Sequence, residues 1–387
     1  MPREIVLFGT GIDAEKFVYE HGNEYDIKYV LELDKKIDKF LYKYDVFTPT
    51  MENCSRHFII IACDFSRSKI SPMLEKFGKR EFIDFIWYEW ENKKMVVLNG
   101  NCYGAQIKKY LASNNEFSKN FYFYPIPQIY ENKLGTIDDY IMKNCSLFLH
   151  QDIRQDNKLG YKLSDDYLNK LLPKNAVSIT IPNLVGFASC FFMQDKQPNP
   201  FNKPLPKTKY GLFPNGDIII DKLCIEAFST NQIVEKCINL IWFSKEDINA
   251  KLNYNIKKFK KREENWDIKI LDYILDFFRE KKVFYDSNHP ANFVMRKICE
   301  EILKKLGIDT RLELLGNGIN SYEMPIYPDI SESLKLSWGD EIIRENSPYK
   351  LTANKMDMRE YIKEYIFWCH QEKIRGTDRD KYDYAFD

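Results

Sequence analysis

Short apolar runs alternate with amphipathic segments along the first ninety residues of the chain. Runs of strand-like composition occupy residues 3–8, 27–33, 57–62 and 81–87. The first run ends in Gly9-Thr10-Gly11 and is followed by apolar side chains at helical spacing, and a second amphipathic segment follows the third run. This alternation predicts a small Rossmann-like α/β domain over residues 1–92.

The glycine turn of this domain is a candidate ligand site. Glycines without Cβ atoms allow a phosphate to approach the backbone N–H groups of the following helix. The second predicted strand carries Glu32 and Asp34 at its end, where dinucleotide folds keep an acid. Gly9, Thr10, Gly11 and Asp34 would form a nucleotide or nucleotide-sugar site. A tight turn without any ligand explains the same residues. NAD redox chemistry ranks below both, because no hydride-transfer site is recognisable later in the chain.

The same alternation restarts at residue 95 and predicts a second domain over residues 93–320. Its predicted strands are 95–98, 121–126, 146–150, 177–181 and 283–285. The predicted helices between them are 103–113, 136–144 and 164–172. A mostly parallel, three-layer α/β domain is expected, with a long loop over 195–216 and added helices between 221 and 281. Residues 321–387 are expected to form a helical extension whose tail frays from residue 376.

Composition excludes several classes of protein. Lys+Arg and Asp+Glu both total 57, so a surface that coats nucleic acid is not expected, and the basic run 257–262 is predicted to be a solvated helix face. No export signal and no apolar stretch of about 20 residues is present, which predicts a cytoplasmic protein without a membrane span. Nine scattered cysteines without a CxxC pair indicate reduced thiols, with neither a disulfide framework nor a metal site.

One cysteine, Cys102, stands at a position that suits nucleophilic catalysis. Cys102 follows an Asn-Gly-Asn turn between a predicted strand and a predicted helix. A side chain there lies at the carboxyl edge of the sheet, and the first helical N–H groups favour a thiolate and an oxyanion. Cys102 is therefore a candidate nucleophile, with Asn101, Tyr103 and Gly104 around the oxyanion. A small buried turn residue is the alternative.

A candidate base lies in the segment Asp286-Ser287-Asn288-His289-Pro290, between a predicted strand and an amphipathic helix. Pro290 places His289 in the first helical turn, where the local field favours a neutral imidazole. Asp286 could accept a hydrogen bond from one ring nitrogen and orient the other, although a surface N-cap explains the same residues. Together with Cys102, this pattern resembles the SGNH type of hydrolase with cysteine in place of serine, which leaves room for thioester chemistry.

Four segments together resemble the WcbI family of polysaccharide biosynthesis proteins. They are residues 99–104, 147–154, 181–183 and 288–292. The resemblance covers roughly residues 95–310 and does not include the N-terminal domain. It implies an acetyltransferase of bacterial capsule assembly that binds coenzyme A, with a sugar hydroxyl as acceptor. Whether Cys102 forms an acyl-enzyme or positions the thioester stays open.

Further polar residues would complete the site at the same sheet edge. Gln151 could donate to the oxyanion. The other predicted substrate contacts are Asn183, Asn288 and Asn292. The predicted coenzyme A contacts are Arg154, Lys108 and His150, with Arg154 meeting a phosphate. Polar loops satisfied by their own backbone, and lysines that face water, are the alternatives.

The sequence therefore predicts a coenzyme A-dependent O-acetyltransferase for a capsular or surface polysaccharide precursor. His289 would deprotonate Cys102 or the acceptor hydroxyl. The expected partners are acetyl-CoA and a sugar or glycan, with a homo-oligomer left open. An esterase or deacetylase would use the same residues with water as acceptor. A non-catalytic nucleotide-sugar-binding module is the alternative from another class of protein, and a dehydrogenase ranks last.

Overall fold

The structure is a computed structural model that describes residues 2–63, 67–81, 83–88, 93–132, 135–156, 158–201, 213–312, 323–338, 342–344 and 354–370. It divides into two compact units. The first is Met1–Lys94 with Asn120–Tyr122, and the second is Met95–Lys119 with Phe123–Asp387. The tail predicted to fray from residue 376 lies outside the described residues. Among those described, none of the helices combines the length and the apolar character that crossing a bilayer requires.

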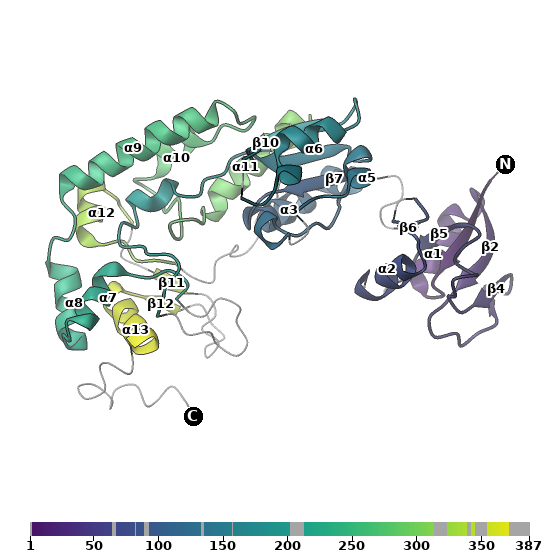
Figure 1. Ribbon diagram of the computed structural model, residues 1–387, viewed down its shortest axis with the longest axis horizontal. Coiled ribbons are helices and arrows are strands. Elements are labelled where there is room, and N and C mark those ends of the chain that lie inside the picture. Colours follow the sequence, from purple (N-terminus) through teal and green to yellow (C-terminus); the bar gives the residue numbers. More distant parts are fainter. Residues whose placement is uncertain are drawn as a thin grey trace. The chain divides into compact units, whose positions relative to one another are not determined.

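The first unit is a Rossmann-like sheet in the order β3-β4-β2-β1-β5-β6 (Figure 1). Its strands are β1 (Arg3–Phe8), β2 (Tyr25–Leu31), β3 (Lys39–Phe40), β4 (Tyr44–Phe47), β5 (Phe58–Ile61) and β6 (Phe85–Trp87). All pairs are parallel except β3 with β4. The predicted strand 81–87 begins only at Phe85, and the short strands β3 and β4 were not predicted.

Alternate residues of β1 face two different cores. Ile5 and Leu7 pack with α1 (Ile12–His21), whereas Val6 and Phe8 pack with α2 (Arg67–Lys76). Because successive side chains of a strand point to opposite faces, one helix covers each face of this sheet. Every one of these four β1 side chains is fully buried.

The glycine turn after β1 is shaped by the protein itself. A Cβ on Gly9, whose φ is +122°, would lie 2.3 Å from the carbonyl oxygen of Ala62, so only glycine fits there. Thr10 donates from its backbone N–H and its hydroxyl to Glu32, at 3.0 and 2.7 Å. The acid that reaches the turn is therefore Glu32, while Asp34 is exposed. Nucleotide binding by Gly9, Thr10, Gly11 and Asp34 remains a prediction.

The second sheet has the order β10-β9-β7-β8. Its strands are β7 (Lys94–Asn99), β8 (Phe121–Phe123), β9 (Leu147–Gln151) and β10 (Val177–Ile181), and β7, β9 and β10 pair in parallel. The predicted strand at 283–285 does not form, and Phe284 makes only an isolated bridge with Pro290. All residues of β9 and all but the first of β7 are buried, as in parallel sheets covered on both faces.

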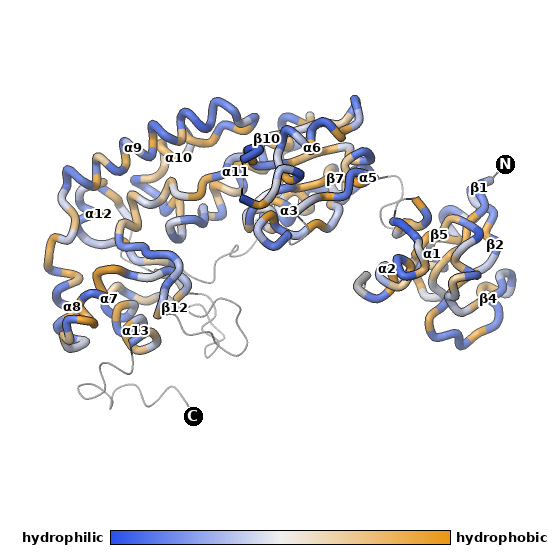
Figure 2. The backbone as a smooth tube through the Cα atoms, viewed as in Figure 1, coloured by the Kyte–Doolittle hydropathy of each residue, from blue (hydrophilic) through white to orange (hydrophobic). Residues whose placement is uncertain are grey.

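Helices surround this sheet and extend beyond it. Near the sheet are α3 (Tyr103–Ser113), α4 (Asn115–Asn120), α5 (Asp139–Lys143), α6 (Asp165–Leu171) and α11 (Asn292–Lys305), with α3 against α11 and α5 against α6. The added helices are α7 (Ile218–Ile225), α8 (Thr230–Asn239), α9 (Lys245–Glu263), α10 (Leu271–Phe277), α12 (Pro328–Leu334) and α13 (Met358–His370). Polar and apolar residues alternate in stripes along α9 (Figure 2), which is typical of a helix with one buried face.

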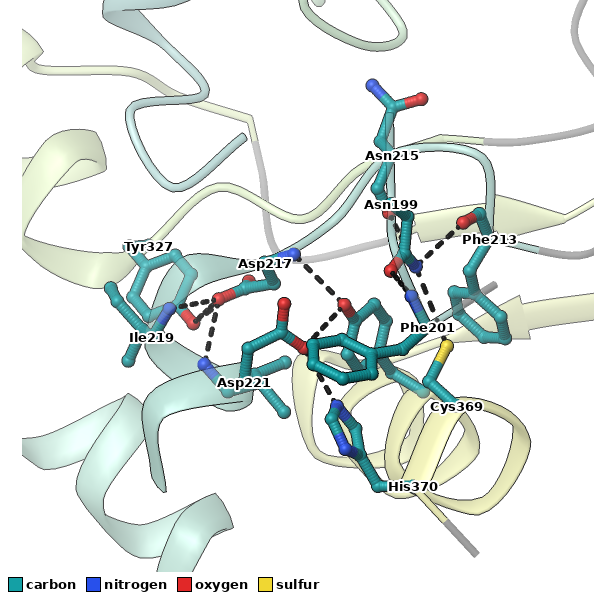
Figure 3. Close-up of polar contacts among 12 residues, drawn as sticks. Asn199, Phe201, Phe213, Asn215, Asp217, Ile219, Asp221, Tyr327, Cys369 and His370 are labelled. Atoms are coloured by element: carbon teal, nitrogen blue, oxygen red, sulfur yellow. Dashed lines mark hydrogen bonds and ion pairs between the residues drawn. The ribbon is translucent and has the colours of Figure 1, made fainter. Parts of the chain in front are cut away.

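The described helices beyond residue 320 pack on the other helices of the second unit. Helix α12 packs on α9, and α13 packs on α7 and α8. Figure 3 shows the polar contacts that tie α13 to α7. Asp221 accepts hydrogen bonds from Tyr365 at 2.9 Å and from His370 at 2.8 Å, and Tyr327 donates to Asp217. Burial raises the pKa of Asp217 to about 7. Buried carboxylates need such partners, so α13 is an integral part of the second unit.

Candidate active site

Cys102 lies where β7 ends and α3 begins. Gly100 forms the turn close to Gln151, since a Cβ there would lie 3.3 Å from the Gln151 side chain. Cys102 is the N-cap residue of α3. Seven of the nine cysteines are buried, whereas Cys102 and Cys63 are half-buried. Cys102 is therefore one of the two thiols to which a substrate has access.

The predicted partner of Cys102 lies next to it. The Cys102 Sγ atom is 3.4 Å from His289 Nε2, and His289 Nδ1 donates to Asp286 Oδ2 at 2.8 Å. The backbone N–H groups of Asn288 and His289 donate to Asp286 Oδ1, both at 2.8 Å. Asp286 is only 2% exposed, and these three bonds fix its position. A thiol, an imidazole and a carboxylate thus form one continuous chain of contacts.

A tight loop, in place of the predicted strand end, holds His289. Tyr285 N–H donates to the His289 carbonyl at 2.9 Å, and Ala291 N–H donates to the Val283 carbonyl at 2.9 Å. These two bonds bring the ends of the loop together. Pro290 follows His289, and α11 begins two residues later at Asn292, so the imidazole lies just before a helix, as predicted.

The neighbours of His289 favour its protonated form, whereas a neutral imidazole was predicted. Burial lowers the pKa of His289, but its hydrogen bonds to Asp286 and Cys102 and their negative charges outweigh burial and raise it to about 10. The prediction considered only the field of the helix and omitted the two anionic neighbours. An imidazolium beside the sulfur stabilises negative charge on that sulfur, as in other cysteine nucleophiles.

We expect the His289 imidazole to remain protonated at pH 8, where a free histidine is neutral. The folded protein should hold this proton at pH 8 and lose it as the pH rises through about 10. Side-chain NMR of labelled histidine measures this titration. In Cys102→Ala the sulfur charge is gone, so the pKa should fall. An unchanged pKa in that variant would contradict the coupling between the two side chains.

Hydrogen bonds connect helix α3 to the loop that carries His289. Tyr103 donates from its hydroxyl to the Asn288 carbonyl, and Gln106 donates to Asn292 Oδ1 at 2.5 Å. Asn288 Nδ2 donates to Gln197 at 2.7 Å. These bonds engage Asn292 Oδ1 and Asn288 Nδ2, which were predicted to contact substrate. In the structure Asn288 and Asn292 connect helix α3 to the loop that carries His289.

The turn before Cys102 presents donors suited to an oxyanion. Asn101 Oδ1 accepts from Tyr103 N–H and from Gln151 Nε2, both at 3.1 Å, and Gln151 Oε1 accepts from Asn101 N–H. Gln151 Nε2 also reaches the Pro182 carbonyl. Gln151 therefore shapes the turn and is not a free donor, contrary to the prediction. Within the described residues, the Cys102 N–H and Asn101 Nδ2 make no hydrogen bond and can donate to an oxyanion.

Two other predicted substrate residues lie close to this turn. A Cβ on Gly104 would lie 2.7 Å from the Leu98 side chain, so this glycine lets α3 pack closely on β7. Asn183 follows Pro182, whose carbonyl Gln151 contacts, and its Oδ1 accepts from Val185 N–H at 3.2 Å. Gly104 thus serves packing, while contact between Asn183 and a substrate remains a prediction.

His150 is not available to a cofactor. It is 3% exposed and stacks on Phe148. Its Nδ1 lies 2.9 Å from Asp165 Oδ1, and its Nε2 lies 3.1 Å from the Ser178 hydroxyl. Both ring nitrogens are engaged within the protein, so the predicted coenzyme A contact is not supported. The reason is that His150 is buried within β9 and is not exposed at the edge of the sheet.

The remaining cationic residues differ in their surroundings. Lys108 is half-buried over the Phe123 ring, 5.7 Å from its centre, and burial lowers its pKa. Arg154 is exposed on the loop after β9. Its charge acts on Arg262, at the end of α9, which also interacts with Tyr103 and Asp152. Arg262 was not predicted to belong to the site. It falls on the stripe formed by Leu252, Asn255, Phe259 and Trp266, and this spacing was the available signal.

Comparison with known proteins identifies the family. The sequence profile described as "Polysaccharide biosynthesis enzyme WcbI" matches residues 95–311, which is more than half of the chain. The chain belongs to the WcbI family. It is therefore an enzyme of polysaccharide biosynthesis, as the sequence resemblance implied. No curated protein matches the chain significantly.

A solved structure of WcbI itself shares the fold of this family member. The two chains are 18% identical, with a TM-score of 0.55 over 72% of this chain and 90% of the other. That structure is described as a novel polysaccharide biosynthesis enzyme, in its native form without a disulfide bond between coenzyme A and a cysteine of that protein. At this identity the likeness establishes the α/β fold, while the SGNH-like detail stays a prediction.

Proposed function

We propose that this chain is an O-acyltransferase that uses acetyl-CoA to acylate a sugar hydroxyl of a polysaccharide precursor. The observation that carries the proposal is the chain of contacts from Cys102 through His289 to Asp286. A thiol held beside an imidazolium suits exchange with a thioester, which is the activated form in which acyl-CoA supplies its acyl group. The coenzyme A named in the description of the WcbI structure supports the same donor.

Cys102 would act as the nucleophile. Its thiolate attacks the thioester carbonyl carbon, and the carbonyl electron pair moves to oxygen. The Cys102 N–H and Asn101 Nδ2 then donate to that oxyanion. When the carbon–sulfur bond of the donor breaks, His289 gives its Nε2 proton to the departing thiolate. The acyl group is left on Cys102, and the leaving thiol is neutral.

His289 would next act as the base. Acylation removes the negative charge on sulfur, one of the interactions that raise the pKa of His289. The imidazole, now neutral, accepts the proton of the acceptor hydroxyl as its oxygen attacks the acyl carbon. Cys102 leaves as a thiolate, and the ion pair with His289 is restored. Asp286 stays ionised throughout and holds the imidazole in place.

The test combines acetyl-CoA with sugar acceptors and follows the release of coenzyme A. Release should depend on both the acceptor and His289, and brief incubation with the donor alone should add one acetyl group to the peptide that contains Cys102. Equal background release by wild type and His289→Ala would contradict the proposal. Release that depends on His289 but not on any acceptor would indicate a hydrolase instead.

A further inference from the structure

The basic run near the end of α9 separates into two groups. Lys257, Lys258, Lys260 and Lys261 are exposed, as a solvated helix face predicts. Arg262 is half-buried on the other side of the helix. The centres of the Phe259 and Trp266 rings lie 4.7 and 5.4 Å from its guanidinium carbon. The side chain is thus held in one direction by two buried aromatic residues.

This direction brings the guanidinium toward the candidate active site. Its charge interacts with Tyr103, the residue that follows Cys102, and with Asp152 and Arg154 on the loop after β9. The three neighbours belong to two elements that leave the carboxyl edge of the sheet. The end of α9 is also anchored to the edge strand, because Asp267 N–H donates to the Thr180 carbonyl at 3.0 Å. Arg262 is therefore fixed beside the catalytic edge.

The Arg262 side chain lacks a polar partner in the described part of the chain. Its aromatic neighbours stack on it, but no hydrogen bond or ion pair joins it to a described residue. Burial lowers the pKa of Arg262, and the like charge of Arg154 acts in the same direction, yet a guanidinium stays protonated. A partly desolvated cation with unused N–H donors is costly unless an anion binds to it.

We infer that Arg262, with Arg154 beside it, binds a phosphate group of a substrate. The planar fork of the Arg262 guanidinium matches phosphate oxygens, and the charge of Arg154 acts at the same place. Because the site is proposed to use acetyl-CoA, this inference rests on the proposed function. It adds a contact between Arg262 and a phosphate group. The diphosphate of the donor and the phosphate of an activated-sugar acceptor share this chemistry, and the experiment below distinguishes them.

The experiment measures binding by calorimetry, which does not depend on catalysis. The variant Arg262→Met keeps the aliphatic stem against the two aromatic rings, and Lys261→Met removes one exposed charge from the adjacent position as the control. With coenzyme A, R262M should bind roughly tenfold or more weakly than wild type, and K261M should bind like wild type. Pantetheine, which has no phosphate, should bind all three proteins equally. Arg262→Lys, which keeps the charge without the fork, should be intermediate.

Each outcome decides the inference. If R262M weakens UDP-glucose and leaves coenzyme A unchanged, the phosphate belongs to the acceptor, and the inference holds. If R262M changes neither affinity relative to K261M, or weakens pantetheine equally, the inference is wrong. Thermal unfolding of each variant separates loss of binding from loss of folding. A wild type that binds coenzyme A without acyl transfer would refute the proposed function, while these affinities would still decide the role of Arg262.

Discussion

Replacing Cys102 with alanine should lower the rate of acyl transfer from acetyl-CoA by about 10³-fold or more. The side chain supplies the attacking atom, and neither His289 nor the oxyanion donors can replace it. Cys102 is half-buried, so the protein should still fold when this side chain is truncated. Single-turnover release of coenzyme A measures the rate, and thermal unfolding measures the stability.

A matched control for this variant is Cys63→Ala. Cys63 is the other half-buried cysteine and belongs to the first unit. It should keep the wild-type rate. The double variant Cys102→Ala with His289→Ala should be no slower than either single variant, because the two groups act in the same steps. Wild-type activity in Cys102→Ala would leave the sulfur without a catalytic role.

Asp286→Asn should lower the rate of acyl transfer by roughly 10²- to 10⁴-fold. An asparagine oxygen can still accept from the two backbone N–H groups. Its NH₂ group would then face His289 Nδ1–H, so two donors oppose each other and the imidazole loses its orientation. Loss of the aspartate charge also removes one cause of the raised pKa of His289. The pH profile of the rate should therefore shift together with the histidine titration.

The pH dependence of stability gives an independent check on this variant. The interactions that raise the pKa of His289 stabilise the folded state fully below about pH 6.5. That contribution to the unfolding free energy disappears as the pH rises toward about 10. The difference in unfolding free energy between wild type and Asp286→Asn should thus shrink from pH 6 to pH 10. Asp276→Asn, at an exposed position on α10, is the control and should change neither rate nor profile. A wild-type rate in Asp286→Asn would show that the carboxylate does not orient the base.

Regular strands and helices were predictable from local pattern. The strand Val177–Ile181 and the helix Tyr103–Ser113 occur with the predicted bounds, because apolar periodicity and flanking turn residues agree there. The predicted strand 283–285 was wrong because of tertiary packing. Phe284 is buried against Phe187 and Phe191, so an apolar run that looked like a strand belongs to a loop inside the core.

The sequence predicted which side chains form the candidate site, but it did not predict the charge of His289. Cys102, His289 and Asp286 meet as expected, because turns between strands and helices converge at one sheet edge. The charge of His289 depends on distances between its neighbours, which no linear pattern gives. Arg262 was overlooked because four lysines precede it within five residues, although helical spacing puts it on the buried face.

The contact between Cys102 and His289 joins positions 187 residues apart in the chain. Bonds from Tyr103 and Gln106 to the neighbouring loop span almost the same separation. During synthesis the thiol therefore emerges long before its base exists, and a partly made chain has a cysteine without an imidazolium beside it. The pair of thiol and imidazole is therefore completed only after both distant segments have docked.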